Sequence, residues 1–558
     1  MSEKKGVWFV AVFLAAIFNV GAAERAPGKA GIASAHPLAT EAGHAMLVQG
    51  GNAFDAAVAV AAALAVVEPN GSGIGGGGFI LLHRASDGFN TMIDAREKAP
   101  AAATRDMYLD VQGKPVQHLS LDSALAAGIP GEPAGMAHLA AQYGRLPLKT
   151  SLQPAIRLAR EGFPVYPRLQ SAIQSKQDTF KRSRETARLF LKNGEVPPLG
   201  FTIKQPDLAR TLELLANKGA DAFYHGAFAR KLAAGVRKAG GNWTEKDLAD
   251  YRTVERAPIL GTYRSARIIS ASPPASGGIA LVDALNILED YDLSAFEPAT
   301  RKHVIVEAMR RMHRDRASYL GDPDFVQIPV ERLTNKYYAQ GQRTSLRLDR
   351  ATPSEMLPSD AISASTGTQT THFSILDRDG NRVAVTFTLN TGFGTGIVVP
   401  GTGILLNNEM DDFSVKPGVP NVYNLIGAEA NSIMPGKRPL SSSAPAFVET
   451  RGGVMIVGSP GGSYIIGMVL LATLDFLAGK SAADIVSAPR FHHQYYPDVI
   501  SYEPDALTEE ERVALTTRGH RLREGGPWGN IQVVTWDYAS GKVEAAADPR
   551  GDGEGRVY

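Results

Sequence analysis

The chain has 558 residues, of which 44% are hydrophobic and 21% charged, the composition of a globular protein with a large core. Its formal net charge of +1 gives no indication of a nucleic-acid partner. The chain contains no cysteine, which excludes a cysteine nucleophile, a thiolate metal site and any disulfide. Length alone is compatible with roughly three or four domains.

The N-terminus has the pattern of a secretory signal. Lys4 and Lys5 precede an apolar run over residues 7–18, and small residues at 21–23 offer a cleavage site. The run is shorter than the ~20 residues that span a bilayer. We therefore predict a cleavable signal peptide over residues 1–23, export to the periplasm or the medium, and no membrane anchor after its removal. An uncleaved interfacial anchor is the alternative.

The first elements of the mature chain surround a glycine-rich segment. Residues 54–67 are apolar nearly all round, with Asn52 as a possible N-cap and Pro69 as a stop, so they predict a buried helix. Residues 71–78 contain G-x-G-x-x-G, but here the motif follows a helix and precedes a strand at 79–83. A dinucleotide site requires the opposite order, so we reject that interpretation.

Periodicity predicts mixed structure up to residue 370 and mainly strands after it. A strand at 91–96 pairs with the one at 79–83, residues 135–250 are mostly helical, and 302–319 is a later helix. We predict that the charged residues of that helix form a solvated face: Arg310, Arg311, Arg314, Asp315 and Arg316. The strands predicted after residue 370 are 373–376, 383–389, 454–457, 531–536 and 543–545, with helices at 464–477 and 482–487.

The polar run at 343–369 leads directly into a well-patterned hairpin, and we interpret this junction as a cut site. Matching the apolar faces of the two strands pairs Phe373 with Val385. That register sets Thr370 opposite Thr388 and places Asn390 on the same polar face. A two-residue turn at 379–380 would shift the pairing by one residue and bury polar side chains. On the hairpin alone, the threonines are better explained as ordinary strand formers.

Several motifs in one order now carry a family resemblance: TTHFS (370–374), TFTLN (386–390), GILLNNEMDDF (403–413), RPLSS (438–442), GSPGGS (458–463) and APRFHH (488–493). With the glycine-rich segment and Arg96, they resemble the γ-glutamyltranspeptidase family over essentially the whole mature chain. The resemblance implies an α+β fold, the four-layer αββα sandwich of N-terminal-nucleophile hydrolases. It also implies a proenzyme that cuts itself into a large subunit, 24–369, and a small subunit, 370–558, which form a heterodimer with one fused core.

The chemistry fits the residues at the cut. A threonine hydroxyl is a weak nucleophile that needs a base, and breaking the Gln369–Thr370 bond gives Thr370 a free α-amine with a reference pKa of about 7.7–8.0. We hypothesise that the Thr370 hydroxyl first attacks the Gln369 carbonyl and that water hydrolyses the resulting ester. The mature hydroxyl then attacks a γ-glutamyl amide, with Thr388 donating a hydrogen bond that orients it.

The resemblance assigns the oxyanion donors to the backbone of Gly461 and Gly462, between a strand and a helix start. The alternative is a tight turn that needs glycine for its backbone.

The resemblance also assigns the substrate site. Arg96 would bind the α-carboxylate bidentately with help from two hydroxyls, and acceptors would bind the α-ammonium. The hydroxyls are Ser441 and Ser442, and the acceptors are Asn390, Glu409 and Asp412. Tyr423, in the loop 416–423, would close over the substrate as a lid. Without the family resemblance, we would interpret Arg96 as forming a surface ion pair with Glu97. Glu409, Asp412 and the loop 416–423 would be interpreted as ordinary solvent-exposed loops.

The expected substrates are glutathione and other γ-glutamyl compounds, with amino acids or peptides as acceptors, and no cofactor, metal or nucleic acid. We interpret His492 and His493 as structural, since no H-E-x-x-H context surrounds them. Two alternatives stay open: an acylase of the same fold for glutaryl or cephalosporin side chains, and a non-catalytic exported binding protein. Asp412 favours γ-glutamyl substrates, because glutaryl acylases tend to depart from this acidic pattern. The intact Thr370 set weighs against a binding protein.

Overall fold

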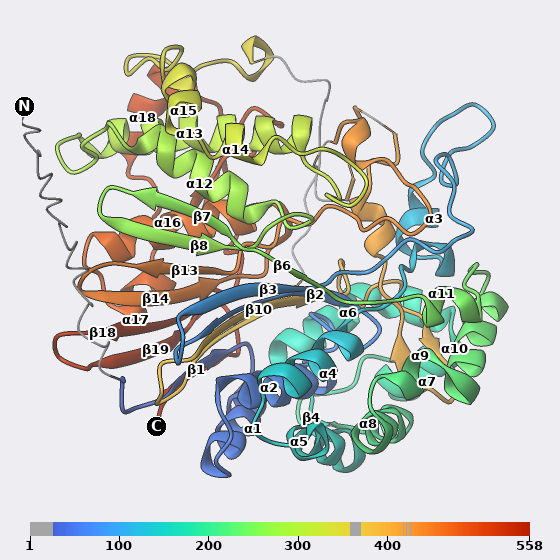
Figure 1. Cartoon of the computed structure of the whole chain (residues 1–558). Coiled ribbons are helices and arrows are strands. Elements are labelled where there is room, and N and C mark those ends of the chain that lie inside the picture. The colour runs from blue at the N-terminus through green and yellow to red at the C-terminus, as the bar shows by residue number, and fades with distance from the viewer. Residues whose placement is uncertain (1–25, 358–369, 417, 420, 423–424, 426) are drawn as a thin grey trace, which may run out of the picture.

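The computed structural model of the chain describes residues 26–357, 370–416, 418–419, 421–422, 425 and 427–558 (Figure 1). The predicted signal peptide, Gln369 and Tyr423 lie outside the described residues. No described helix is long and apolar enough to span a membrane.

Two antiparallel sheets form the centre of the molecule. The first has seven strands in the order β20 (Glu554–Val557), β1 (Gly31–Ser34), β9 (Thr371–Leu376), β10 (Arg382–Thr388), β2 (Gly77–Arg84), β3 (Phe89–Ala95) and β6 (Val254–Arg256). The second has six: β19 (Val543–Ala547), β18 (Gln532–Asp537), β14 (Gly453–Gly458), β13 (Ala446–Glu449), β8 (Ala266–Ser270) and β7 (Ile259–Tyr263). Each sheet takes strands from both sides of Thr370, so the two halves of the chain share one core.

The sheets pack face to face, and helices cover their outer faces (Figure 1). Side chains such as Phe79 and Leu81 from the first sheet and Phe447 and Ile456 from the second fill the space between them. The order helix, sheet, sheet, helix confirms the predicted four-layer αββα sandwich. Length alone would allow roughly three or four separate domains, but the two halves of the chain share one core instead.

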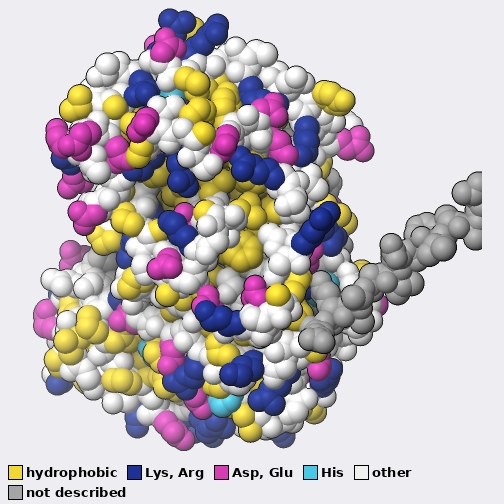
Figure 2. Space-filling model, turned by 90° about the vertical axis from the view of Figure 1, so that its left-hand side faces the viewer, with side chains coloured by type: hydrophobic (Ala, Val, Ile, Leu, Met, Phe, Trp, Pro, Cys, Tyr) yellow, Lys and Arg dark blue, Asp and Glu magenta, His cyan; other side chains and the backbone are white. Residues whose placement is uncertain are grey.

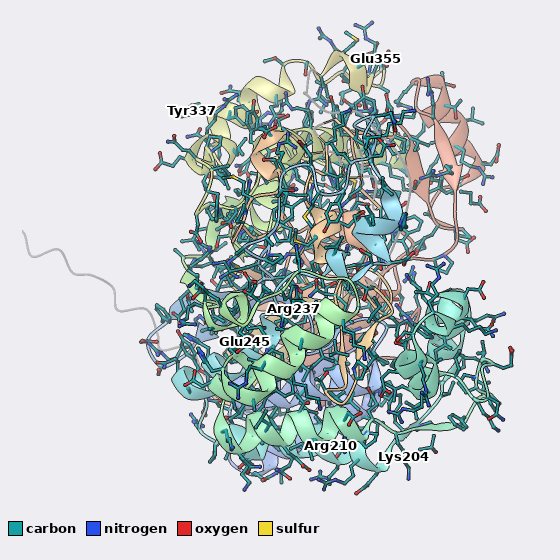
Figure 3. The ribbon with its side chains drawn as sticks, turned by 90° about the vertical axis from the view of Figure 1, so that its right-hand side faces the viewer. Lys204, Arg210, Arg237, Glu245, Tyr337 and Glu355 are labelled. Carbon is teal, nitrogen blue, oxygen red and sulfur yellow. The ribbon has the colours of Figure 1, made fainter. Side chains whose placement is uncertain are left out.

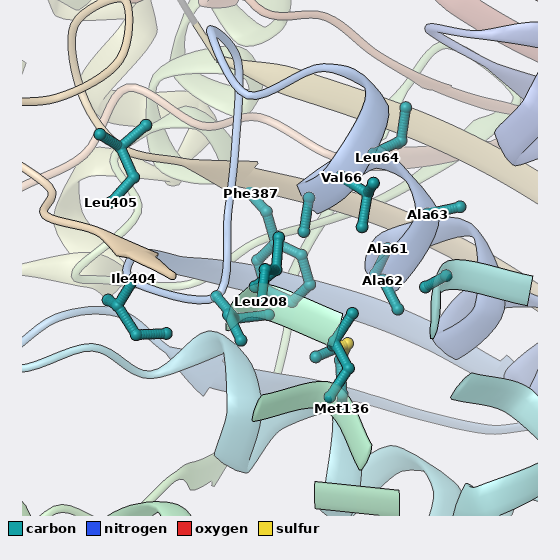
Figure 4. Close-up of a cluster of buried hydrophobic side chains, with 14 of the residues drawn as sticks. Ala61, Ala62, Ala63, Leu64, Val66, Met136, Leu208, Phe387, Ile404 and Leu405 are labelled. Atoms are coloured by element: carbon teal, nitrogen blue, oxygen red, sulfur yellow. The ribbon is translucent and has the colours of Figure 1, made fainter. Parts of the chain in front are cut away.

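The helices below and to the right of the seven-stranded sheet in Figure 1 are α1 (Pro37–Val48), α2 (Ala53–Val67), α4 (Glu132–Tyr143), α5 (Leu148–Glu161), α6 (Pro167–Lys181), α7 (Arg184–Phe190), α8 (Pro206–Lys218), α9 (Asp221–Tyr224), α10 (Gly226–Lys238) and α11 (Glu245–Ala249). The predicted α2 is buried along its whole length, begins at the predicted cap Asn52, and packs its alanines against Met136, Leu208 and Phe387 (Figure 4). A capping box between Asn52 and Asp55 satisfies its first backbone N–H groups.

The opposite helix layer contains α12 (Gly277–Leu288), α13 (Pro298–Tyr319), α14 (Val330–Leu333), α15 (Lys336–Arg343), α16 (Ile465–Leu477), α17 (Ala482–Ser487) and α18 (Glu509–Thr517). A cavity of about 340 Å³ opens between α13, α16 and α17, and no predicted site residue lines it. Figure 2 shows the left-hand side of the molecule in Figure 1, where hydrophobic side chains gather in a hollow and charges of both signs are interspersed around it. The remaining short elements are α3 (Gln117–Leu121), β4 (Phe163–Pro164), β5 (Thr202–Ile203), β11 (Val398–Val399), β12 (Ile404–Leu405), β15 (Phe491–His492), β16 (Ile500–Tyr502) and β17 (Leu522–Glu524).

The hairpin of β9 and β10 has the predicted register. Phe373 lies opposite Val385 and Ile375 opposite Val383. The Asp377 carboxylate accepts the N–H groups of Asp379 and Asn381, which closes the turn. The two-residue turn that we rejected is therefore absent from this hairpin.

The predicted solvated face of α13 is wrong. Arg310, Arg311, Asp315 and Arg316 are all at most 4% exposed. Irregular segments cover this face and supply its partners: Glu307 accepts from Arg311 (2.6 Å) and from the Thr352 N–H (3.1 Å), and Arg310 pairs with Asp498. By contrast, Arg210 on α8 and Arg237 on α10 are exposed, on the face of the molecule that Figure 3 shows.

This network predicts an acid-sensitive contribution to stability. Burial alone would raise the pKa of Glu307, but Arg310 and Arg311 more than offset it and lower that pKa to about 2. The folded carboxyl is therefore a stronger acid than the unfolded one, so its stabilisation is present above about pH 4.5 and lost as the pH falls towards 2. A shift of this size corresponds to about 3 kcal/mol.

We expect Glu307→Gln to destabilise the protein near neutral pH and to flatten the fall in stability between about pH 4.5 and 2. Urea unfolding midpoints at several pH values measure both effects. Glu245→Gln, at an exposed position of α11, is the matched control and should leave the midpoints unchanged. A Glu307→Gln variant with the wild-type pH dependence would contradict the assignment.

Candidate active site

The end of the hairpin, where β9 begins and β10 ends, holds the predicted nucleophile. The glycine-rich segment crosses this end: a Cβ added to Gly76 would lie 2.0 Å from the Thr388 carbonyl oxygen, and one on Gly77 2.3 Å from that of Ala95. Only glycine permits such a close approach of two backbones. The glycines therefore build the wall of the site, rather than a nucleotide loop.

Thr370 and Thr388 are in contact, as the register predicts. Their Oγ1 atoms are 3.3 Å apart, and the Asn390 N–H donates to the Thr388 Oγ1 at 2.8 Å. In this structure the Thr370 hydroxyl donates to Thr388, which is the reverse of the expected direction. Before cleavage the nitrogen of Thr370 belongs to a peptide bond, so Thr388 offers the hydroxyl an acceptor that the amine does not yet provide.

Removing the Thr388 hydroxyl should impair the site without abolishing it. We expect Thr388→Val to lower kcat roughly 10- to 100-fold, because the nucleophile loses an orienting hydrogen bond in a buried site. Steady-state release of p-nitroaniline from a chromogenic γ-glutamyl donor measures the effect. Thr388→Ser keeps the hydroxyl and should stay within about threefold of wild type; equal loss in both variants would contradict the hydroxyl role.

Gly461 and Gly462 lie in the turn between β14 and α16. At the end of β14, Gly458 packs against the His372 ring of β9: a Cβ added to Gly458 would lie 2.2 Å from that ring. The turn that follows Gly458 therefore begins beside the start of β9. The φ angles of the two glycines, 140° and 55°, lie in the left-handed region. Among the described residues neither N–H donates a backbone hydrogen bond, so both can serve an anion.

The residues predicted to bind the α-carboxylate and the α-ammonium of the substrate contact one another. Arg96 Nη1 lies 2.6 Å from Glu409, its Nη2 2.5 Å from Asp412, and Nη1 is 3.6 Å from Glu97. Arg96 and Glu97 are fully buried, so the alternative interpretation of Arg96 as part of a surface ion pair with Glu97 is wrong. Arg96 Nε faces the Pro439 carbonyl at 3.2 Å.

This cluster has more carboxylates than cations. Burial raises the pKa of Glu97 to about 7 and raises that of Glu409 well above its ordinary range. Glu132 lies in the same surroundings, and burial together with Glu97 raises its pKa as well. A buried cluster that concentrates acidic groups suits a ligand ammonium.

Ser441 and Ser442 lie beside this cluster. The segment that carries them runs along residues 274–276, with the Ser441 N–H donating to the Pro274 carbonyl at 2.8 Å. The Ser442 Oγ accepts from Arg316 Nη2 at 3.1 Å, and Ser441 donates to Ser443 at 3.0 Å. The structure thus joins Thr370 to Thr388 and Asn390, and Arg96 to Glu409 and Asp412. The carbonyl of Leu440, the residue before the two serines, lies 3.5 Å from Arg96 Nη2.

The described part of the predicted lid touches the acidic residues. Asn421 Nδ2 donates to Asp412 at 3.1 Å, and the Val422 N–H donates to Asp411 at 3.0 Å. Tyr423 itself lies outside the described residues.

One group of side chains away from the site has the ligand types of a metal site: His303, Glu307 and His520. Their atoms are engaged with each other and with the protein. His303 contacts His520 at 2.7 Å and the Arg347 carbonyl at 2.6 Å, and Glu307 is paired with two arginines. These cationic neighbours oppose a metal ion, so we assign the group to the hydrogen-bond network of α13. His493 likewise contacts Asp498, at 3.1 Å.

With this geometry in place, comparisons with known proteins decide the family. The model of the family described as gamma-glutamyltranspeptidase matches residues 39–558. The chain belongs to the γ-glutamyltranspeptidase family. It is 45% identical to the "Glutathione hydrolase proenzyme" of Escherichia coli (strain K12), over 93% of this chain and 90% of that protein. It is 38% identical to the protein of the same name from Bacillus subtilis (strain 168), over 94% and 91%.

Solved structures agree with the γ-glutamyltranspeptidase assignment. The crystal structure of cephalosporin acylase from Bacillus halodurans superposes with a TM-score of 0.83 at 29% identity, covering 95% of this chain and 96% of that one. The Helicobacter pylori gamma-glutamyltranspeptidase superposes with a TM-score of 0.57 at 42% identity, covering 58% and 93%. Fold and family are therefore as predicted.

Sequence reasoning missed several residues of this γ-glutamyltranspeptidase site. Asn407 joins the Gly75 and Gly128 carbonyls at 2.7 Å each and so ties the acidic loop to the glycine-rich segment. Glu68, at the end of α2, accepts a 2.5 Å hydrogen bond from Thr371, the residue after the nucleophile, and burial raises its pKa to about 7. A lone acid ending an apolar helix was the available signal. Arg316 was predicted from the sequence to lie on the solvated face of α13, and it is buried instead.

Proposed function

We propose that the chain is a self-processing γ-glutamyl hydrolase and transferase that acts on glutathione and related γ-glutamyl compounds. The observation that carries the proposal is the hydroxyl contact between Thr370 and Thr388 beside a buried cluster of Arg96, Glu409 and Asp412. A nucleophile at a cleavable position and a subsite for an amino-acid head group are what this chemistry requires. The glutathione hydrolase names of the relatives support the same substrate class.

Processing comes first. The Thr370 hydroxyl attacks the Gln369 carbonyl carbon, its proton passing towards Thr388, and the tetrahedral intermediate collapses as the C–N bond breaks. The leaving nitrogen takes up a proton and becomes the α-amine of Thr370, and water hydrolyses the new ester. The products are a large subunit ending at Gln369 and a small subunit starting at Thr370, which remain together because both sheets contain strands of each.

Turnover uses the exposed amine. It accepts the hydroxyl proton, directly or through water, as the Thr370 Oγ1 attacks the γ-carbonyl of the donor. The N–H groups of Gly461 and Gly462 stabilise the oxyanion, and the amine returns the proton to the leaving group. The γ-glutamyl ester is then released by water as glutamate, or transferred to the amine of an amino acid or peptide.

The charge cluster supplies recognition. Glu409, Asp412 and Asn390 bind the donor α-ammonium, while Arg96, Ser441 and Ser442 form the subsite for its α-carboxylate. Tyr423 closes the lid. We further propose that residues 1–23 direct export to the periplasm or medium and are then removed.

Purified protein on a denaturing gel, with N-terminal sequencing of the smaller band, tests the processing. Two bands, with the smaller one starting at Thr370, are expected, together with release of p-nitroaniline from γ-glutamyl-p-nitroanilide. An uncut chain with no such release would contradict the proposal and favour a binding protein.

A second candidate, a glutaryl side-chain acylase, is favoured by the close superposition on cephalosporin acylase. The substrates of the two candidate functions differ in one group: a glutaryl donor lacks the α-ammonium that the acidic cluster would bind. A higher kcat/KM for glutaryl-p-nitroanilide than for the γ-glutamyl donor would select the acylase.

A further inference from the structure

A buried acid, Glu68, contacts the residue that follows the nucleophile and has no part in the chemistry described above. Glu68 is the C-cap of α2 and is 3% exposed. Its Oε2 accepts a hydrogen bond from the Thr371 hydroxyl at 2.5 Å, a length typical of a hydroxyl bonded to a carboxylate. Burying an acid costs free energy unless it is hydrogen-bonded, so this contact with Thr371 is a specific one.

The end of α2 is shaped to hold the Glu68 carboxyl. The Gly71 N–H donates to the Glu68 carbonyl at 2.8 Å, which fixes the turn after the helix. A Cβ added to Gly71 would lie 3.0 Å from the Glu68 Oε2, so the glycine leaves room for the carboxyl. Three further titratable groups act on Glu68 or respond to its charge: Arg168 on α6, Asp552 before β20, and Tyr166.

Thr371 lies where β9 is paired on one side only. The pairing of β1 with β9 reaches Phe373 and stops there, whereas β10 pairs with β9 as far as Thr371. Because side chains alternate along a strand, Thr371 shares the face of Phe373, which packs towards α2, and Thr370 has the opposite face. Cutting the Gln369–Thr370 bond makes Thr370 a chain end, and chain ends fray unless they are tied down.

We propose that Glu68 is a positioning residue for the nucleophile: through the Thr371 hydroxyl it anchors the new N-terminus against α2 after the cleavage. The inference rests on the proposed function and adds to it a residue that does not touch the substrate. The anchor fixes the backbone that carries both the Thr370 hydroxyl and its α-amine. It therefore supports the chemical step, and not the binding of the donor head group at Arg96.

The anchor weakens when the Glu68 carboxyl takes up a proton. Burial raises the pKa of Glu68 to about 7, while Arg168 and the Thr371 hydroxyl oppose the rise and Asp552 adds to it. The carboxylate is therefore the main form well above this pH, and the neutral acid is the main form well below it. A carboxylate accepts a hydrogen bond more strongly than a neutral carboxyl or an amide does. The strength of the anchor thus changes within the pH range of an enzyme assay.

Glu68→Gln keeps the shape of the side chain and removes its charge. At about pH 8.5 we expect kcat for γ-glutamyl-p-nitroanilide to fall about 10-fold, with KM within about threefold of wild type, because a charge-assisted bond that positions the nucleophile is lost. At about pH 5.5 the difference should shrink to less than about threefold, since the wild-type carboxyl is then protonated. The ratio of the two kcat values cancels the titration of the Thr370 α-amine, which both enzymes share.

Thr371→Val should reproduce this pattern, and Thr371→Ser, which keeps the hydroxyl, should have a kcat within about threefold of wild type. The double variant of Glu68→Gln and Thr371→Val should lose little more than either single change, because the two side chains act as one unit. Ser374→Ala is the matched control. It removes another buried hydroxyl of β9, bonded to the Gln532 carbonyl at 3.0 Å, away from the end of the strand. It should lower the unfolding midpoint and leave kcat unchanged.

A loss of kcat that is the same at both pH values, or equal losses in Thr371→Val and Thr371→Ser, would overturn the inference. If Glu68→Gln does not mature, the comparison of Thr371→Val with Thr371→Ser decides the question. The wild-type enzyme tests the proposed function separately: if it gives neither two subunits nor p-nitroaniline, that function fails before any variant is compared. A wild type that matures and turns over, with variants whose loss does not depend on pH, would remove the anchor alone.

Discussion

Thr370→Ala is expected to give a single uncut chain and to lower activity on a γ-glutamyl anilide by more than about 10⁴-fold. The variant lacks the hydroxyl that we propose attacks the Gln369 carbonyl, so neither the ester nor the free α-amine should form. Both functions of the residue are lost together, and losses of this size follow the removal of a nucleophile that works as a unit with its base. A denaturing gel and the anilide assay measure the two effects.

Thr370→Ser is the matched control, since it keeps the hydroxyl and removes only the methyl group. It should mature into two subunits and retain measurable activity. Circular dichroism and the thermal unfolding midpoint of Thr370→Ala should resemble those of the uncut wild-type precursor. Two subunits in the alanine variant would show that another residue performs the cleavage.

The hairpin at the nucleophile could be predicted because its pattern is strict. β9 and β10 alternate apolar and polar residues with period two, and a shift by one residue would bury the wrong set, so a single register survives. The contact between Thr370 and Thr388 follows from that register without any knowledge of the fold. Helix α2 was predictable for a related reason: it is apolar all round and has clear start and stop residues.

The pairing of β1 and β20 could not be predicted in the same way. Each strand has four residues, they lie at opposite ends of the chain, and β1 joins β20 to β9. Such short segments become strands because a neighbouring edge is available to pair with them, which is a tertiary effect. The first sheet therefore extends beyond its predicted strands.

Helix α13 shows why a charged face can mislead. Its arginines have the spacing of an exposed face, and sequence periodicity reports only which residues share that face. The partners that bury them come from distant irregular segments, such as Thr352 and Asp498. At the site, too, the sequence pattern did not show which distant residues come into contact. Motifs identified Arg96, Glu409 and Asp412 separately, but only the structure shows that they pair.

Gly461→Ala is expected to lower kcat about 10²- to 10³-fold with KM within about threefold of wild type. The glycine adopts φ 140°, which L side chains rarely adopt, and an added Cβ would lie 2.6 Å from the Met468 Cε. The turn must shift, which moves the N–H groups away from the position where the oxyanion forms. Loss of one such donor typically has an effect of this size on kcat.

A paired comparison isolates the oxyanion role of this turn. Gly479, just beyond the other end of α16, also has a positive φ, 84°, but nothing lies within 4 Å of an added Cβ, so Gly479→Ala should carry the backbone strain without the loss of activity. Adding Met468→Ala relieves the contact but not the φ angle, and should restore kcat only in part. The gel must show two subunits before kcat is compared. A matured Gly461→Ala enzyme with wild-type kcat would mean that the oxyanion is stabilised elsewhere.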